Sequence, residues 1–262
     1  MNANKTSSTA PSSNDTRKDF AEKCVLVTGG GKGIGLAITL NFAAQGARLV
    51  IFDHTQGSAD AAARAARDAG APDAMGIALD VGDEQAIVEA MQQAMQKFGP
   101  IHVIVNNAGT MDFKPIIELT YDDWQKILKV DLLAPFVLTR EAFKHMKMGG
   151  TVVNVASIHA IETSPNVAPY AAAKAATLSL TRSASIEGKP LGIRVNAVLP
   201  GAIDTPMLWN NPNVKAGKEK IDKNDVGQPR DIAEMVAFLA SDRAAFVNGA
   251  SFVVDGGRIA RL

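Results

Sequence analysis

Three residues in the second half of the chain have the types and spacing for acid–base chemistry. Tyr170 and Lys174 are four residues apart, which places both on one face of a helix, and Ser157 lies thirteen residues before Tyr170. A phenol has an ordinary pKa of about 10, so it exchanges protons at neutral pH only where a neighbour stabilises the phenolate. An ammonium group does this, and a serine hydroxyl can hydrogen-bond the reacting oxygen. The alternative is a helix beginning at Pro169 with an exposed Lys174.

A glycine-rich turn follows the first apolar run of the chain. Residues 28–35 read Thr-Gly-Gly-Gly-Lys-Gly-Ile-Gly and lead into a helical pattern. Glycines allow the backbone to approach a pyrophosphate, which sits on the unpaired N–H groups of a helix N-terminus. An ordinary glycine loop is the alternative, but a strand before the turn and a helix after it favour dinucleotide binding. Gly33 follows Lys32, so the turn is not a P-loop.

Polar residues end the next predicted strands. Asp53 comes 18 residues after Gly35, where a carboxylate can accept hydrogen bonds from a ribose and would repel a 2′-phosphate. This favours NAD over NADP, whereas Lys32 is a small signal for a phosphate. A surface aspartate that opens a turn is the alternative. Asp80 and Asn107 end two further strands, where they either contact adenine and ribose or form turns.

Short apolar runs alternate with helical patterns and must position these residues. The predicted strands are Cys24–Thr28, Leu49–Asp53, Gly76–Leu79, Ile101–Asn106, Thr151–Ala156, Ile193–Leu199 and Ser251–Val254. The predicted helices are Gly35–Gln45, Ser58–Ala69, Glu84–Lys97, Tyr121–Lys144, Tyr170–Glu187 and Pro229–Ala240. We therefore expect an α/β fold: a single-domain Rossmann-type, doubly wound parallel sheet of about seven strands with helices on both faces. In such sheets ligands bind beyond the carboxyl ends of the strands.

Composition excludes several functional classes. Lys+Arg and Asp+Glu both number 27, so the zero net charge argues against nucleic-acid binding. The single cysteine, Cys24, excludes an internal disulfide and suits a reducing compartment. No apolar run is long enough to span a membrane. Residues 1–19 are mostly polar and predict a flexible tail before one catalytic domain, 20–262. We expect a soluble, cytoplasmic, globular protein.

Together, these residues resemble the short-chain dehydrogenase/reductase family. The resemblance runs from Lys23 to Gly257 and rests on the order and spacing of several motifs. These are the glycine-rich turn at 28–35, Asn-Asn-Ala-Gly at 106–109, Ser157 with Tyr-x-x-x-Lys at 170–174, Pro200-Gly201 with Thr205, and Val-Asp-Gly-Gly at 254–257.

The resemblance implies cofactor contacts for particular residues. Backbone at Gly29, Lys32 and Ile34 would hold the pyrophosphate, Asp53 the adenosine ribose, and Asp80 and Val81 would flank adenine. Asn107 would line the cofactor groove. Contacts at the nicotinamide end would come from Pro200, Gly201, Ile203 and Thr205. NAD is the cofactor expected, and no metal is expected because His54, His102 and His145 lack ligand spacing.

The resemblance also implies the catalytic roles. Tyr170 would be the acid/base, Lys174 would bind the nicotinamide ribose and lower the pKa of the tyrosine, and Ser157 would orient the substrate oxygen. One position departs from the family, because Asp131 stands where relatives have Asn. In relatives the main-chain carbonyl of that residue helps to hold a water in a proton relay. An aspartate keeps the carbonyl, but its charge favours the ammonium of Lys174 and opposes a phenolate at Tyr170. We expect an active enzyme with a shifted pH optimum.

The substrate is less well specified. Residues 202–227 occupy the position of a mobile substrate lid in relatives. Candidate apolar walls are Met111, Phe113, Ile158, Ile161, Met207, Leu208 and Trp209. Such a pocket suits a secondary alcohol or ketone of moderate size, such as an alicyclic one. His159 either contacts substrate or faces solvent.

Three functions remain open at this stage. The first is an NAD-dependent secondary alcohol dehydrogenase. The second is an NADP-dependent 3-ketoacyl-type reductase, which Asp53 disfavours and for which Lys144 and Lys147 are a poor docking surface. The third is a catalytically silent, NAD-sensing binding protein. Relatives form dimers and tetramers, so a homo-oligomer, such as a homotetramer, is expected.

Overall fold

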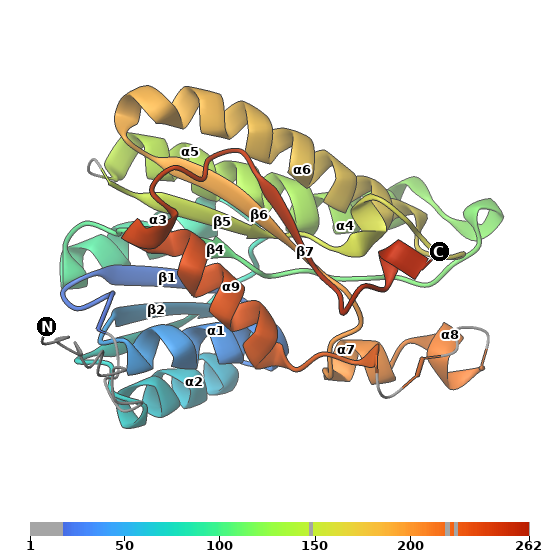
Figure 1. The fold of residues 1–262 in the computed structure, drawn as a ribbon, viewed down its shortest axis with the longest axis horizontal. Helices are drawn as coiled ribbons and strands as arrows, with labels where there is room; N and C mark the ends of the chain where they lie inside the picture. Colours follow the sequence, from blue (N-terminus) through green and yellow to red (C-terminus); the bar gives the residue numbers. More distant parts are fainter. Residues whose placement is uncertain (1–17, 147–148, 218–220, 223–224, 262) are drawn as a thin grey trace, which may run out of the picture.

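One parallel sheet forms the centre of the molecule (Figure 1). The computed structural model describes residues 18–146, 149–217, 221–222 and 225–261. Within them, the strands are β1 (Cys24–Thr28), β2 (Arg48–Asp53), β3 (Ala74–Ala78), β4 (Val103–Asn106), β5 (Thr151–Val155), β6 (Arg194–Pro200) and β7 (Ser251–Val254). Their order is β3-β2-β1-β4-β5-β6-β7, and every neighbouring pair is parallel. The predicted fold class is confirmed, and every predicted strand is present with ends within two residues.

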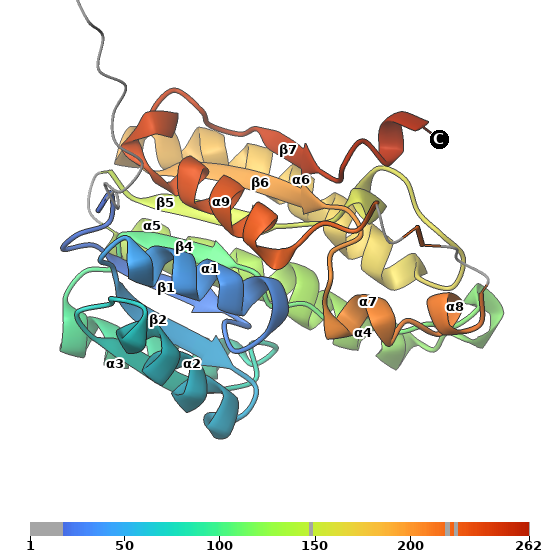
Figure 2. The same cartoon turned by 60° about the horizontal axis from the view of Figure 1, so that its bottom comes forward.

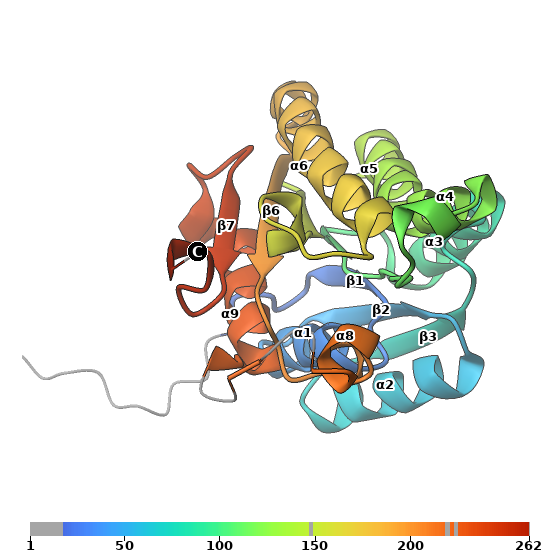
Figure 3. The ribbon, with the colours of Figure 1, turned by 90° about the vertical axis from the view of Figure 1, so that its right-hand side faces the viewer.

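Helices cover both faces of the sheet (Figure 3). One layer holds α1 (Gly33–Ala44), α2 (Gln56–Asp68) and α9 (Pro229–Ala240); the other holds α3 (Glu84–Phe98), α5 (Ala134–His145) and α6 (Ala168–Gly188). Successive side chains of a strand point to opposite faces. In β1, accordingly, Val25 and Val27 pack in the core beneath the first layer, whereas Cys24 and Leu26 pack in the core beneath the second.

The helix predicted over Tyr121–Lys144 is interrupted. It begins with α4 (Tyr121–Leu128), continues through a π-helical turn, η2 (Lys129–Leu133), and only then becomes α5. A capping box formed by Thr120 and Asp123 opens α4. Pro135 explains part of the interruption, because it has no N–H to donate to the Asp131 carbonyl four residues earlier. π-Helical turns occur frequently at functional sites, and Asp131, at the centre of this one, is fully buried.

The segment predicted as a lid and the end of the predicted N-terminal tail lie at least partly within the described residues. The lid predicted over residues 202–227 contains α7 (Pro206–Trp209) and α8 (Pro212–Lys215), which project beyond the carboxyl-terminal edge of the strands (Figure 2). Residues 1–17 of the predicted N-terminal tail lie outside the described residues. Asp19, at its end, pairs with Arg243 at 3.3 Å. None of the helices in the described ranges has the length and apolarity needed to cross a bilayer.

Candidate active site

The predicted catalytic residues come together at the carboxyl-terminal edge of the sheet. Ser157 follows β5 and caps the short η3 turn (Ile158–Ala160), where its hydroxyl accepts the His159 N–H at 3.2 Å. Tyr170 and Lys174 both belong to α6, and the Lys174 ammonium lies 5.5 Å from the centroid of the Tyr170 ring. All three side chains are buried. Lys174 also donates to the Val155 carbonyl at 3.1 Å, which ties α6 to the end of β5.

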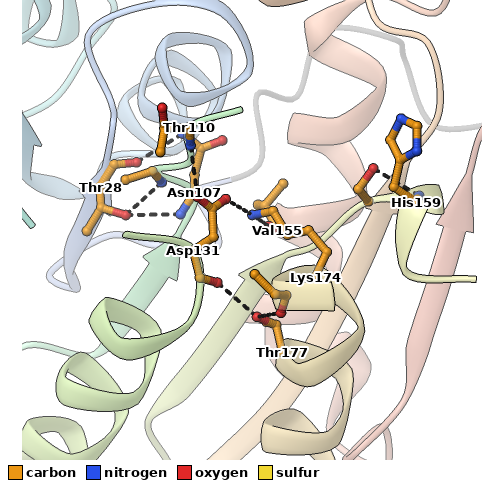
Figure 4. Close-up of polar contacts among 11 residues, drawn as sticks. Thr28, Asn107, Thr110, Asp131, Val155, His159, Lys174 and Thr177 are labelled. Atoms are coloured by element: carbon orange, nitrogen blue, oxygen red, sulfur yellow. Dashed lines mark hydrogen bonds and ion pairs between the residues drawn. The ribbon is translucent and has the colours of Figure 1, made fainter. Parts of the chain in front are cut away.

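Asp131 forms an ion pair directly with Lys174 (Figure 4). One carboxylate oxygen lies 3.1 Å from the ammonium nitrogen, and the other accepts the Thr110 N–H at 3.0 Å. Gly109 leaves the space that this pair needs: a Cβ there would come within 2.8 Å of the Asp131 carboxylate. The position where relatives carry Asn therefore supplies a buried counter-ion for the lysine.

The main-chain carbonyl of Asp131 has a second partner. The Thr177 hydroxyl, one turn along α6 from Lys174, lies 3.0 Å from this carbonyl and donates to it. Thr177 uses one of the two lone pairs of this carbonyl oxygen; the water expected at the same carbonyl stays a prediction. Pro135, four residues after Asp131, was the signal in the sequence that this carbonyl would be free of an α-helical partner. No feature of the sequence indicated that Thr177, Thr110 and Gly109 would lie next to Asp131.

The pair changes the proton affinities of the site. The pKa of Tyr170 is raised overall, first by burial and then by the Asp131 carboxylate. The Lys174 ammonium and the contact with the Ser157 hydroxyl lower this pKa but do not outweigh burial. Burial by itself would lower the pKa of Lys174, but the Asp131 carboxylate and Tyr170 raise it. Burial raises the pKa of Asp131 despite the opposing lysine. Lys174 thus stays an ammonium, while the phenolate of Tyr170 is opposed by the carboxylate, as the sequence predicted for Asp131.

The glycine-rich turn is braced from the neighbouring strand. The Asn107 amide nitrogen donates to the carbonyls of Thr28 and Gly29, at 2.9 and 3.2 Å, and the Thr28 hydroxyl accepts the Asn107 and Ala108 N–H groups (Figure 4). A Cβ on Gly35 would collide with the Gly29 carbonyl and the Asn107 amide. Asn107 was expected to line the cofactor groove. In the structure, its side-chain amide nitrogen hydrogen-bonds the backbone of the glycine-rich turn.

The turn and Asp53 form a cradle that fits a dinucleotide. Gly29 and Gly33 have positive φ, +61° and +54°, which glycine adopts without strain. The Asp53 carboxylate accepts the Gly31 N–H at 2.9 Å, so the end of β2 is locked against the turn. Lys32 is the exposed N-cap of α1, and Ile34 lies in the first turn of that helix. The N-terminal N–H groups of α1 are the ones that bind phosphates in such turns.

The remaining predicted cofactor residues lie along the same edge. Val81 is buried after β3, and the exposed Asp80 accepts the Gly82 N–H at 2.8 Å, as in an ordinary turn. The other four lie at the end of β6 and in the loop that follows it: Pro200 is the last residue of β6, and Gly201, Ile203 and Thr205 come after it. A Cβ on Gly33 would lie 3.3 Å from the Thr205 methyl group, so the loop after β6 contacts the glycine-rich turn.

A cavity of about 490 Å³ opens beside Ser157. Four of the predicted wall residues line it: Met111, Ile158, Met207 and Leu208. Phe113, Ile161 and Trp209 lie outside the lining, and the Trp209 indole donates instead to Asp204 at 2.7 Å. His159 lines the cavity and packs edge-on against Tyr170, with ring centroids 5.9 Å apart. Arg258 also lines the cavity, which the sequence analysis missed.

Among the described residues, no three His, Cys, Asp or Glu side chains are grouped in a way that could hold a metal ion.

Comparisons with known proteins find several similar chains. The family model described as enoyl-(acyl carrier protein) reductase matches residues 29–258. A cis-4-hydroxycyclohexanecarboxylate dehydrogenase from Sinomonas cyclohexanicum is 41% identical over 91% of this chain and 97% of its own. An NADP-dependent (R)-specific alcohol dehydrogenase from Lentilactobacillus kefiri is 36% identical over 91% of this chain and 97% of its own. The crystal structure of levodione reductase has a TM-score of 0.87, with 34% identity, 93% of this chain covered and 100% of that one.

The buried ion pair makes a prediction for stability. Removing one partner strands the other charge in the interior, whereas removing both leaves none. We expect Asp131→Asn and Lys174→Met each to lower the free energy of unfolding, and the double variant to lower it by about 2 kcal/mol less than the sum. Urea unfolding of the four proteins measures this coupling.

The control is the surface pair of the exposed Lys126 and the half-buried Asp112, 3.6 Å apart, treated in the same way. Its coupling should stay below about 0.5 kcal/mol. Additive losses at Asp131 and Lys174 would contradict a functioning ion pair.

Proposed function

The chain belongs to the short-chain dehydrogenase/reductase family, and on that premise we propose that it is an NAD-dependent dehydrogenase of secondary alcohols. It is an oxidoreductase acting on alcohols or ketones; the cofactor preference, the residue roles and the substrate are our proposal. The observation that carries the proposal is the buried set of Ser157, Tyr170 and Lys174, of which Ser157 lines the cavity.

The preference for NAD rests on Asp53. Its carboxylate lies against Gly31 at the end of β2 and keeps lone pairs for the hydroxyls of an adenosine ribose. A 2′-phosphate there would meet a negative charge. Lys32, the nearest cation in the turn, is exposed at the N-cap of α1, where it serves the pyrophosphate. Relatives of this chain include an NADP-dependent enzyme, so this preference needs its own test.

The catalytic roles follow from what each side chain touches. Bound NAD supplies the acceptor for the hydride that leaves the carbinol carbon. Ser157 donates a hydrogen bond to the substrate oxygen, and the phenolate of Tyr170 takes the hydroxyl proton as the carbonyl forms. Lys174 holds its ammonium beside the Tyr170 ring and stabilises the phenolate. Asp131 keeps that ammonium charged and opposes the phenolate.

The cavity supports an alicyclic secondary alcohol as substrate. Its lining includes the apolar side chains of Met111, Ile158, Met207 and Leu208, and a volume of about 490 Å³ accommodates one or two rings. The name of the relative at 41% identity describes a cyclohexane ring bearing a hydroxyl and a carboxylate. The other readings of the sequence, an NADP-dependent 3-ketoacyl-type reductase and a silent NAD sensor, are outcomes of the tests below.

The proposal includes a homo-oligomer and a cytoplasmic location. Large apolar side chains are exposed on several elements, including Phe136 on α5, Ile186 on α6 and Phe246 before β7. Exposed apolar surface of this kind is common at interfaces between subunits.

The first experiment replaces Tyr170. We expect Tyr170→Phe to lower kcat/KM at least about a hundredfold for oxidation of cyclohexanols with NAD, because the acid/base is lost. Reduced nicotinamide absorbance measures turnover, and NAD binding should remain. The chain offers a matched control in its second tyrosine, the exposed Tyr121, since Tyr121→Phe should leave turnover unchanged. NAD binding without turnover of any alcohol or ketone, with either cofactor, would favour the silent sensor.

The second experiment concerns the cofactor. The two Asp53 carboxylate oxygens accept the N–H groups of Gly31 and His54, both at 2.9 Å. Asp53→Asn removes the charge and keeps an oxygen for only one of these N–H groups, and we expect the ratio of kcat/KM with NAD to that with NADP to fall at least about tenfold. Asp68→Asn, at the exposed end of α2, is the control. A wild-type enzyme that prefers NADP would contradict the proposed NAD preference and favour the NADP-dependent 3-ketoacyl-type reductase.

The third experiment is a pH profile. Oxidation needs the Tyr170 phenolate, so kcat/KM rises as the pH rises through its pKa. The Asp131 carboxylate raises that pKa, so Asp131→Asn should move the ascending limb to lower pH. Asp122→Asn, exposed in the first turn of α4, should not. An unchanged profile in Asp131→Asn would refute the electrostatic role of Asp131.

A further inference from the structure

Asp131 is held at three points by α6 and the loop after β4 (Figure 4). One carboxylate oxygen lies 3.1 Å from the Lys174 ammonium, and the other accepts the Thr110 N–H at 3.0 Å. Its main-chain carbonyl accepts the Thr177 hydroxyl, also at 3.0 Å. Lys174 and Thr177 are three residues apart on α6, so their side chains share one helix face. A single face of α6 therefore contacts both the carboxylate of Asp131 and the backbone of the π-helical turn.

The Thr177 hydroxyl has two carbonyl acceptors within reach but only one proton. The Ala173 carbonyl, one turn earlier on α6, is also 3.0 Å away, which is a contact that threonine commonly makes inside a helix. That carbonyl already has a backbone donor in the α-helix, the Thr177 N–H. The Asp131 carbonyl differs, because Pro135 stands at the position of its α-helical donor and has no N–H. A buried carbonyl without a donor costs free energy, so donation from Thr177 to Asp131 is favoured.

Thr177 is in turn attached to the sheet by a chain of buried side chains. Its carbonyl accepts the Thr181 hydroxyl at 2.8 Å, and that hydroxyl accepts the Asn154 amide at 2.8 Å. Asn154, in β5, accepts the side-chain amide of Asn106, in β4, at 2.7 Å. All four side chains are buried. These bonds join two strands to α6, so Thr177 presents its hydroxyl to Asp131 from a backbone that is anchored to the sheet.

We propose that Thr177 is a positioning residue, which holds the Asp131 carboxylate against Lys174 and thereby sets the pH range in which Tyr170 works. Without the hydroxyl, the π-helical turn loses one of its contacts with α6 and shifts toward another donor. The ion pair is already near contact distance at 3.1 Å, so such a shift lengthens it. A more distant carboxylate opposes the Tyr170 phenolate less. This inference rests on the proposed function for the reaction, but the ionisation of Tyr170 can be measured without turnover.

Titratable groups face Tyr170 from three elements. Lys174 lies on the same helix, with its ammonium 5.5 Å from the ring centroid, and Asp131 acts from the π-helical turn. From η3, His159 packs edge-on against the Tyr170 ring, with the centroids 5.9 Å apart. All of these groups remain in a Thr177 variant. A changed pH dependence in such a variant therefore reports a changed arrangement of the groups and not the loss of a charge.

The pH profile of kcat/KM is the first test. Thr177→Val keeps the β-branched shape but removes the hydroxyl, and we expect it to move the ascending limb to lower pH by about half a unit. In an Asp131→Asn background the same substitution should add no further shift, because the charge that it displaces is already gone. Thr177→Ser, which keeps the hydroxyl, should retain the wild-type profile.

The matched control is Thr139→Val. It removes another buried hydroxyl of the same interrupted helix, one that donates to the Pro135 carbonyl at 2.7 Å and has no contact with the ion pair. This variant should keep the wild-type profile. A shift as large as that of Thr177→Val would contradict a specific role of Thr177.

The ionisation of Tyr170 is the second test and needs no substrate. The chain has only two tyrosines, so in a Tyr121→Phe background the Cζ signal of ¹³C-labelled tyrosine reports Tyr170 alone. NMR titration of the folded protein should give a lower pKa of Tyr170 in Thr177→Val than with Thr177 intact. Thr177→Ala, which also lacks the hydroxyl, should shift the titration in the same direction and takes the place of Thr177→Val if that variant does not fold.

The two tests separate this inference from the proposed function. An unchanged titration of Tyr170, or an unchanged pH profile, in the variants without the hydroxyl would overturn the role of Thr177 while leaving the dehydrogenase intact. A shifted titration in a protein that turns over no alcohol or ketone, with either cofactor, would retain the role of Thr177 and refute the proposed function.

Discussion

The buried ammonium of Lys174 is the constraint on which the site depends. A charge in the interior must be paired and hydrogen-bonded, and the three elements around it meet this need. Val155 at the end of β5 offers a carbonyl, the π-helical turn offers the Asp131 carboxylate, and α6 carries the lysine itself beside Tyr170. Partnering one cation therefore fixes the positions of a strand end, a helix and an interrupted helix relative to one another.

The interrupted helix is the adjustment that makes the pairing possible. Pro135 removes the α-helical partner of the Asp131 carbonyl, which the Thr177 hydroxyl then satisfies at 3.0 Å. Gly109 contributes by having no side chain where the carboxylate and the ammonium meet. Because the pair is neutral overall, it adds little attraction for an anion. Among the described residues that line the cavity, Arg258 and Glu162 carry a formal charge at neutral pH, and they come from segments on either side of α6.

In the cofactor cradle, too, polar side chains hold the backbone in position. Asn107 and Thr28 use their polar groups on the backbone of β1 and its turn, and Asp53 uses one oxygen on Gly31. These bonds hold the glycine-rich turn in its conformation, in which Gly29 and Gly33 have positive φ. The N–H groups at the start of α1 are thereby aimed outward before any ligand arrives, which lowers the ordering cost of binding a phosphate.

The sequence by itself determined whatever depends on local pattern. Apolar runs and helical periods gave all seven strands, and the helix ends fell within two residues apart from the break in Tyr121–Lys144. The four-residue spacing of Tyr170 and Lys174 placed both on one helix face, and Ser157, thirteen residues before Tyr170, was predicted from its residue type and position. Only the tertiary structure decided which distant groups meet. Asp131 and Lys174 are 43 residues apart, and Arg258 is 101 residues from Ser157. Such residues meet only because strands and helices pack together at the edge of the sheet, and a local sequence pattern does not report that packing.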